Sequence, residues 1–142
     1  MNEISYSRDD IPDLLRAHGI TPTHQRTEIA FVLFSLQEHL SADQVLAAVN
    51  VRHSETSKAT VYNTLNLFVQ KGLIREVIAD PNKVFYDPNT TPHHHVYDVV
   101  NGTLTDIDAS SVRIDGLPPP PEGMVAEGVD LILRVRPGAT RA

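Results

Sequence analysis

The sequence predicts an α+β fold, made of an N-terminal winged helix-turn-helix domain followed by a small α/β domain. Within the first 87 residues, four segments with helical apolar spacing precede two short strand patterns, which is the element order of a winged helix. After Asp87, the turn-rich segment "PNTTP" leads into short strand patterns with little helical signal. We therefore expect one domain over residues 1–87, a hinge at about 87–92 and a second domain over residues 93–142.

Capping signals accompany the helical segments of the first half. Asp9 or Asp10 is expected to cap the first helix, and Thr23 the second. Ser41, with Gln44 three residues later, forms a capping-box pattern at the start of the third. The helical segments themselves are 9–18, 21–39, 41–51 and 57–74, the last of them broken at Gly72.

Strand patterns fill the rest of the chain. "LIREVIA" and "KVFYD" flank the turn "DPNK" and are expected to form the hairpin of the wing. Further on, "HHHVYDVV" and "TLTDID" flank the Asn101–Gly102 turn, and "VDLILRVR" is another strand. "SSVRIDG" fits a short helix or turn, and "LPPPPEG" fits a stiff extended connector. Three strands with little helix form a poor core alone, so we expect a dimerisation domain that builds a homodimer.

The composition narrows the class of protein. The chain has 142 residues, 41% of them hydrophobic, and no run of about 18 apolar residues that would span a membrane. Its N-terminus lacks the basic start and apolar core of a signal peptide, so a cytoplasmic protein is expected. The absence of cysteine excludes disulfides and thiolate-bound zinc. A bound metal would therefore need His, Asp or Glu ligands.

The start of the fourth helix is the candidate DNA-reading element. The net charge of −6 argues against nucleic acid, but the stretch from Arg52 to Arg75 holds four basic residues and one acidic residue. An ordinary solvated helix face has a similar composition, so this pattern alone leaves both interpretations open. The side chains that could contact double-stranded DNA are Ser57, Lys58, Thr60, Tyr62, Asn63 and Thr64, with Arg26 on the second helix as a further candidate.

The histidine run at residues 93–95 is a candidate metal site. In a strand, His93 and His95 point to one face and His94 to the other. Nitrogen and oxygen ligands without thiolate suit iron(II), manganese(II) or zinc. A pH switch or an accident of sequence would also account for the run, and the nearby acids also fit turns or exposed strand positions. The other candidate ligands are His39, Asp87 and Asp106.

Several of these segments, taken together, resemble one known family. "GITPTHQRTEIAFVL", "HLSADQVLAAV", "SKATVYNTLNLFVQKGLI" and "KVFYDPNTTPHHHVYD" follow the order and spacing of the ferric uptake regulator (Fur) family, over roughly residues 10 to 136. Within that family, "ATVYNTLN", the triple histidine and "PEG" are most similar to the iron response regulator branch. The resemblance implies a winged-helix domain, a dimerisation domain and a homodimer that binds a palindromic operator in double-stranded DNA.

The resemblance also implies how the protein works. Family members bind a divalent metal between the two domains, and the metal-loaded dimer usually represses iron-homeostasis or peroxide-stress genes. Iron(II) or manganese(II) is the implied cofactor, with zinc as a substitute in vitro. The family's regulatory ligands fall on His39 as the inter-domain histidine, Asp87 after the wing, His93 and His95 as the H-x-H pair, and Asp106 on the following strand.

Four departures from the family pattern stand out. The first Cys-x-x-Cys pair that holds structural zinc in many members reads Asp98 and Asn101 here, so no cysteine-bound structural zinc is expected. Thr21 stands where a basic residue often probes the minor groove, and Asn63 stands where an arginine is common. Arg113 cannot ligate a metal, so the second metal site of some members should be lost or altered.

Two other functions compete with a divalent-metal regulator. In the iron response branch the triple histidine is implicated in haem binding, so His93, His94 and His95 are candidate haem ligands in a haem-responsive regulator. The more remote alternative is a small non-haem metalloenzyme using two histidines and a carboxylate. That alternative lacks a general base apart from the ligands and leaves the fourth helix and the wing unexplained, so we do not expect an enzyme.

Overall fold

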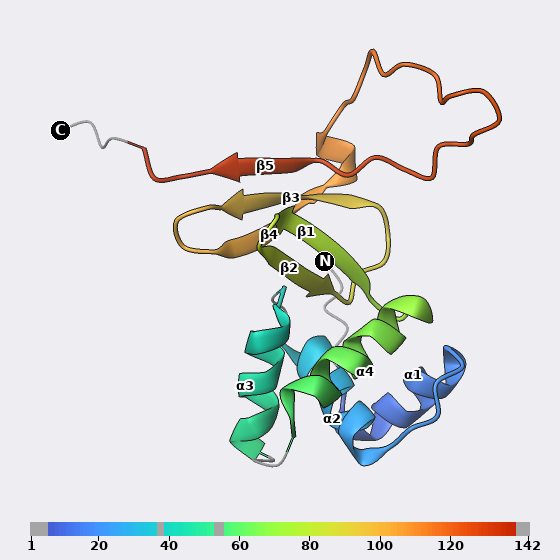
Figure 1. The fold of residues 1–142 in the computed structure, drawn as a ribbon, viewed down its shortest axis with the longest axis vertical. Coiled ribbons are helices and arrows are strands. Elements are labelled where there is room, and N and C mark those ends of the chain that lie inside the picture. The colour runs from blue at the N-terminus through green and yellow to red at the C-terminus, as the bar shows by residue number, and fades with distance from the viewer. Residues whose placement is uncertain (1–5, 37–38, 53–55, 139–142) are drawn as a thin grey trace. The chain divides into compact units, whose positions relative to one another are not determined.

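The computed structural model describes residues 6–36, 39–52 and 56–138 of the chain. The chain divides into two compact units, residues 1–90 and 91–142, and each is described by itself. Helices and small sheets together confirm the α+β class (Figure 1). No helix in the described ranges is both long enough and apolar enough to cross a membrane.

Helices followed by a hairpin make up the first unit. Their order is η1 (Arg8–Asp10), α1 (Ile11–Ala17), α2 (His24–Ser35), α3 (Ala42–Arg52), α4 (Lys58–Gln70), β1 (Arg75–Asp80) and β2 (Lys83–Asp87). The two strands pair antiparallel, as expected for the wing. Helix α2 ends before the predicted residue 39, and positions 37 and 38 lie outside the described residues. The apolar faces of the helices meet in one core that includes Leu15, Ile29, Leu33, Val45, Leu65 and Phe68.

Most of the expected helix boundaries are confirmed. The hydroxyl of Thr23 accepts the amide of Arg26 at 3.2 Å, and Ser41 and Gln44 exchange the two hydrogen bonds of a capping box at 2.9 and 3.3 Å. Gly72 follows α4 with a φ of 73°, a left-handed conformation that glycine adopts without strain.

The expected cap of α1 is confirmed in its position but not in its hydrogen bond. Asp10 is the N-cap residue of α1 by position, but its side chain makes no capping hydrogen bond to that helix. Its carboxylate instead accepts the amide of Ser7 at 3.1 Å and the hydroxyl of Ser7 at 2.9 Å. The reason is that the 3₁₀ turn η1, which spans Asp9 and Asp10, precedes α1, so the first turn of the whole element begins after Ser7.

A three-stranded sheet forms the second unit. It consists of β3 (His93–Asp98), β4 (Thr103–Asp108) and β5 (Ile132–Val135), with the 3₁₀ turn η2 (Ala109–Ser111) after β4. The strand order is β4-β3-β5, with β4 antiparallel and β5 parallel to β3. Strand β5 is shorter than the predicted "VDLILRVR" segment.

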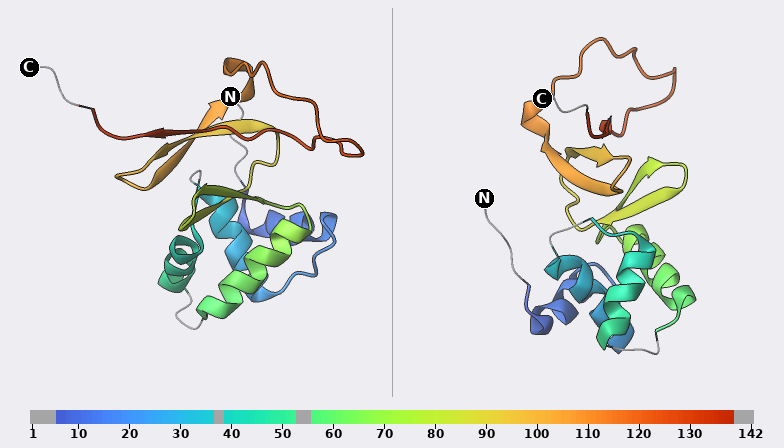
Figure 2. Two further views of the ribbon diagram at one scale, coloured as in Figure 1. Left: turned by 45° about the horizontal axis from the view of Figure 1, so that its top comes forward. Right: turned by 90° about the vertical axis from the view of Figure 1, so that its left-hand side faces the viewer.

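The connection from η2 to β5 is extended. Residues 112–131, all of them described, contain no helix or strand, and Figure 2 shows this segment from two further sides. Prolines 118–121 prevent a continuous helix through the middle of this segment, because proline has no amide donor and clashes with the preceding turn. The expected helix or turn at "SSVRIDG" is only the single turn η2. Leu117, Met124, Val125, Leu133 and Val135 are exposed apolar side chains of this segment and of β5.

Candidate metal centre and nucleic-acid interface

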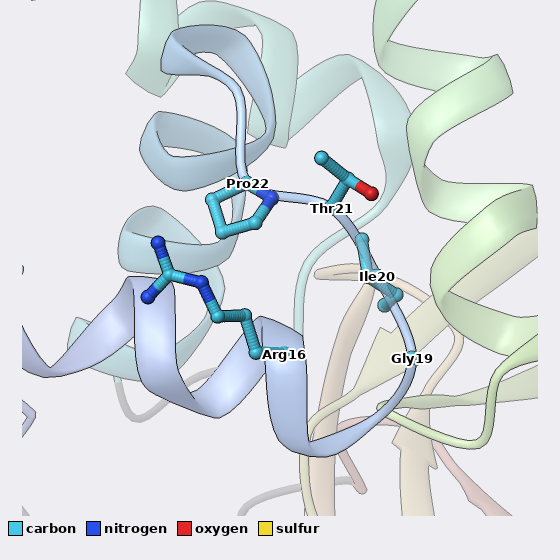
Figure 3. Close-up of a pocket in the computed structure, with 5 residues that line it drawn as sticks. All are labelled: Arg16, Gly19, Ile20, Thr21 and Pro22. Atoms are coloured by element: carbon cyan, nitrogen blue, oxygen red, sulfur yellow. The ribbon is translucent and has the colours of Figure 1, made fainter.

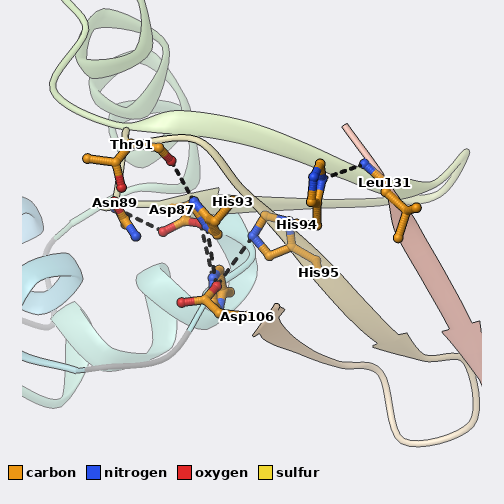
Figure 4. A network of polar contacts seen from close by, with 9 residues as sticks. Asp87, Asn89, Thr91, His93, His94, His95, Asp106 and Leu131 are labelled. Carbon is orange, nitrogen blue, oxygen red and sulfur yellow. Dashed lines mark hydrogen bonds and ion pairs between the residues drawn. The ribbon is translucent and has the colours of Figure 1, made fainter. Parts of the chain in front are cut away.

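Two histidines of β3 face one carboxylate of β4. In the antiparallel register, His95 pairs with Asp106, and His93 lies two residues earlier on the same face. Nε2 of His93 is 3.3 Å from Oδ1 of Asp106, and Nε2 of His95 is 3.5 Å from the same oxygen (Figure 4). The two imidazole rings lie with their centroids 4.5 Å apart. The alternation expected for the run therefore brings three predicted ligands together in the second unit.

The hydrogen bonding of His93 fixes where its proton lies. Nδ1 of His93 is 2.7 Å from the carbonyl oxygen of Thr91, which can only accept, so Nδ1 carries the proton and donates (Figure 4). In the neutral ring, Nε2 then presents a lone pair toward the Asp106 carboxylate, which is also an acceptor. Two acceptors at this distance are stable with a proton or a cation between them. Metal-bound histidines commonly donate their other N–H to a carbonyl, so this arrangement fits a metal ligand.

A second histidine–carboxylate pair lies in the first unit. Nε2 of His39 is 3.1 Å from Oδ2 of Asp87. The pair is positioned by an isolated β-bridge between the adjacent residues, in which the amide of Tyr86 donates to the carbonyl of Leu40 at 2.8 Å. The other carboxylate oxygen of Asp87 accepts the amide of Asn89 at 2.9 Å (Figure 4). The bridge was not predicted from the sequence, because a single non-local residue pair leaves no periodic pattern.

His94 has a separate contact. Its Nδ1 accepts the backbone amide of Leu131 at 3.0 Å, just before β5 begins (Figure 4). It is a buried side chain, 8% exposed, and does not share the Asp106 contact of its two neighbours in β3. Only two of the three rings of the run thus converge on one point.

The predicted DNA-reading residues are mostly exposed on α4. Ser57 caps the helix by accepting the amide of Thr60 at 3.1 Å, and Lys58, Tyr62 and Asn63 are exposed in its first turns. The ammonium group of Lys58 lies 5.7 Å from the ring centroid of Tyr62. The same group is 3.5 Å from a carboxylate oxygen of Asp43 on α3, in a solvent-exposed ion pair of little energetic weight.

Thr64 does not fit the predicted role. It is only 7% exposed, because it lies on the same helical stripe as the core residues Val61, Leu65 and Phe68. Its hydroxyl therefore belongs to the interior of the first unit and is not available to a DNA base. The apolar spacing of α4 contained this signal, since position 64 is three residues after Val61.

Arg26 lies beside the turn between α1 and α2. Its guanidinium donates to the carbonyl of Thr21 at 2.8 Å. The positive charge of Arg26 therefore lies next to position 21, where this sequence has a neutral threonine. An open hollow is lined there by Arg16, Gly19, Ile20, Thr21 and Pro22 (Figure 3). The sequence did not indicate this hollow, because Arg16 and the turn come together only through folding.

Known proteins similar to this chain support one family. Residues 17–115 match the sequence model of the Ferric uptake regulator family. The chain is 28% identical over 106 residues to the peroxide-responsive repressor PerR of Staphylococcus epidermidis, covering 75% of this chain and 71% of that protein. It is 33% identical over 92 residues to PerR of Staphylococcus aureus (strain Mu50), covering 65% of this chain and 62% of that protein. The ferric uptake regulator of Pseudomonas aeruginosa, solved with manganese, matches with a TM-score of 0.69 at 24% identity, covering 91% of this chain and 98% of that chain.

The family match and the similarity to peroxide-responsive repressors identify a metal-responsive transcription regulator rather than an enzyme, and the histidine–carboxylate contacts of each unit are compatible with that class. The chain belongs to the ferric uptake regulator family, as its motifs had indicated. The match to PerR of S. aureus spans less than two thirds of that relative.

Proposed function

We propose that this protein is a metal-dependent DNA-binding repressor whose regulatory ion is held by both units. His39 and Asp87 would supply ligands from the first unit, and His93, His95 and Asp106 from the second. Segment 87–92 would then be the hinge between residues 1–87 and 93–142. When bound, the ion supplies a positive charge that attracts the carboxylate oxygens and the imidazole lone pairs to one point.

The observation that carries this proposal is the contact between Nε2 of His93 and Asp106. The Thr91 carbonyl holds the proton of His93 on Nδ1, so the neutral ring offers a ligand atom to the shared carboxylate. His95 adds a second imidazole from the same strand face. A set of imidazole and carboxylate ligands without sulfur suits iron(II), manganese(II) and zinc.

The names of the relatives support the choice of regulated process. The two staphylococcal proteins are peroxide-responsive repressors, and the Pseudomonas protein was solved with manganese. We therefore propose that the genes under control serve iron homeostasis or the response to peroxide. Such a role places the protein in the cytoplasm, with access to chromosomal DNA.

The proposed DNA contact surface is the exposed start of α4 with the nearby turn. Ser57, Lys58, Thr60, Tyr62 and Asn63 would read or flank the major groove, and Arg26 would contact the backbone. A homodimer would place two such helices on a palindromic operator, with half-sites one helical turn or a multiple apart.

The homodimer would form through the second unit. Among the described strands, β5 pairs with β3 alone, and its side chains Leu133 and Val135 are exposed. Such an edge, next to a small core, is a surface that another strand would cover.

Haem is the rival ligand for the histidine run, and the contacts favour an ion. His93 and His95 converge on Asp106, whereas Nδ1 of His94 is occupied by the amide of Leu131. A cofactor that required all three rings would therefore need β5 to rearrange. Haem could also be coordinated by His93 or His95 without His94. The experiment below distinguishes a regulator that responds to haem from one that responds to a divalent ion.

Fluorescence anisotropy of a labelled operator tests the proposal. Apoprotein is titrated onto the operator with manganese(II), iron(II) under anaerobic conditions, zinc or hemin, and with chelator as the control. We expect tight binding with manganese(II) or iron(II) and weak binding with chelator. Equal affinity in all conditions would show that no metal controls DNA binding, and tight binding with hemin alone would establish the haem-responsive alternative.

A further inference from the structure

His94 is the member of the histidine run that the proposed metal centre does not use. Its Nδ1 accepts the amide of Leu131 at 3.0 Å. The carbonyl of Leu131 accepts the amide of the next residue of β3, His95, at 3.1 Å. Both backbone polar groups of Leu131 are therefore held by consecutive residues of β3, one through a side chain and one through the main chain.

The contact between His94 and Leu131 lies where β5 begins to pair with β3. Its first ladder pair is His95 with Ile132, immediately after Leu131. The preceding residues 112–131 contain no helix or strand, so no packed crossover element aligns the strand. At the far end, the amide of Val99 donates to the carbonyl of Val135 at 3.0 Å. The His94 contact is thus a side-chain contact at the start of β5, made directly from the strand on which β5 pairs.

We propose that His94 is the positioning residue for β5, fixing its register on β3, and that it acts as a hydrogen-bond acceptor rather than as a ligand. An amide N–H can only donate, so Nδ1 of His94 is unprotonated in this contact. The neutral ring then carries its proton on Nε2. His93, whose Nδ1 donates to Thr91, is the opposite tautomer, so two adjacent histidines are assigned different roles by their backbone partners.

This assignment makes strand docking and coordination by His94 mutually exclusive. Coordination through Nε2 leaves the proton of a neutral imidazole on Nδ1, where it would face the Leu131 amide, donor against donor. Coordination through Nδ1 would displace the amide directly. Either mode would remove the hydrogen bond between His94 and the Leu131 amide.

A consequence for assembly rests on the proposed homodimer. Register determines which face of β5 each side chain occupies, because a slip of one residue exchanges the two faces. Leu133 and Val135, which are 52% and 37% exposed, would then point differently toward a second copy. Loss of the His94 contact should weaken the dimer without removing a metal ligand.

Two variants at position 94 separate the acceptor from the bulk of the ring. In His94→Asn, the side-chain carbonyl oxygen is attached to the same carbon as Nδ1 and can accept the Leu131 amide. In His94→Leu, the volume is kept and the acceptor is lost. Amide hydrogen exchange in the protein loaded with zinc, which is diamagnetic, is followed by NMR, with the Leu131 and His95 amides as reporters and the Val99 amide as the internal reference for the other end of β5.

We expect exchange of the Leu131 amide to accelerate about tenfold in His94→Leu and to stay within about twofold of wild type in His94→Asn. Manganese(II) affinity should be unchanged in both variants, and sedimentation should show a weaker dimer only for His94→Leu. An unchanged Leu131 exchange rate in His94→Leu, or equal acceleration in both variants, would overturn the proposal. A loss of manganese(II) affinity in both would instead make His94 a ligand.

A further test uses the wild-type protein and so does not depend on whether the variants fold. Nitrogen NMR of the histidine side chains reports which ring nitrogen carries the proton. We expect His94 to be protonated on Nε2 and unprotonated on Nδ1, and His93 to be protonated on Nδ1. A proton on Nδ1 of His94 would contradict the assigned hydrogen bond whatever the metal or DNA measurements show.

Discussion

Oδ1 of Asp106 lies 3.3 Å from Nε2 of His93, whose other ring nitrogen donates to a backbone carbonyl. In the neutral ring both facing atoms are acceptors, so the contact is favourable only with a proton or a cation between them. This relationship is the local physical reason for expecting metal binding in the second unit, and it leads to the first prediction.

Replacing Asp106 with asparagine should separate metal affinity from stability. The amide nitrogen of Asp106→Asn can donate to Nε2 of His93, which satisfies that nitrogen without a cation. We expect the apoprotein to melt at or above the wild-type temperature, while manganese(II) affinity falls by roughly tenfold or more. Thermal unfolding with and without metal, together with calorimetric titration, measures both effects. A variant that binds manganese(II) normally would place the ion elsewhere.

The exposed start of α4 should carry operator affinity. Tyr62→Ala is expected to weaken operator binding by about 1–3 kcal/mol while manganese(II) affinity is unchanged. Lys58→Ala should reduce the slope of log affinity against log salt by about one. Gln70→Ala, at the exposed far end of the same helix, is the matched control. If Tyr62→Ala and Gln70→Ala bind alike, DNA is read by another element.

The turn between β3 and β4 should keep its conformation without bound zinc. Asp98 accepts the amides of Val100 and Asn101 at 2.9 and 3.0 Å and the side-chain amide of Asn101 at 2.7 Å. These bonds lie at the two positions that correspond to a cysteine pair in many family members. We expect the protein to keep its circular dichroism and to sediment as a dimer after treatment with a strong chelator. Dissociation to monomers on chelation would show that one of the proposed regulatory sites is structural.

The same turn should respond to acid. Hydrogen bonding, chiefly from the backbone amide of Asn101, lowers the pKa of Asp98 below its ordinary value of 3.8. A carboxyl group whose pKa is lower in the folded state stabilises the turn fully above its unfolded pKa, and that contribution is lost as the pH falls through the folded pKa. We therefore expect the protection factor of the Asn101 amide, which compares its exchange rate with that of an unstructured amide at the same pH, to fall only below about pH 4. In Asp98→Ala this protection factor should be low at all pH values.

Local signals in the sequence predicted most of the helices and the grouping of three candidate ligands in the second unit. Thr23 and the Ser41–Gln44 pair could be identified because a cap depends on residues three positions apart. His93 and His95 could be placed on one face because alternation is intrinsic to a strand. By contrast, the role of His94 depends on Leu131, a residue 37 positions away, and no pattern in the sequence specifies such a contact.

Other features depended on packing. Thr64 was assigned to DNA from its residue type, whereas the core stripe of α4 places it inside. The Leu40–Tyr86 bridge that positions His39 beside Asp87 is a single tertiary contact without periodicity. Arg26 was a candidate on the second helix, but its hydrogen bond to the carbonyl of Thr21 became visible only in the folded structure.

We propose that one metal site uses ligands from both units and thereby controls DNA binding. A ligand shifts a conformational equilibrium only through its different affinity for the two states. His39 is the ligand that would tie the helical unit to the ion, whereas His93 and His95 would hold the ion locally. The most direct measurement is operator affinity at saturating manganese(II) for wild type, His39→Ala and His93→Ala, with metal affinity measured in parallel.

We expect His39→Ala to lose most of the metal-dependent gain in operator affinity while it keeps much of its manganese(II) affinity. His93→Ala should lose both, and the chelator-treated proteins should all bind the operator equally weakly. If His39→Ala binds the operator with undiminished metal dependence, the two units do not share a regulatory ion, and the histidine run forms a local site with another purpose.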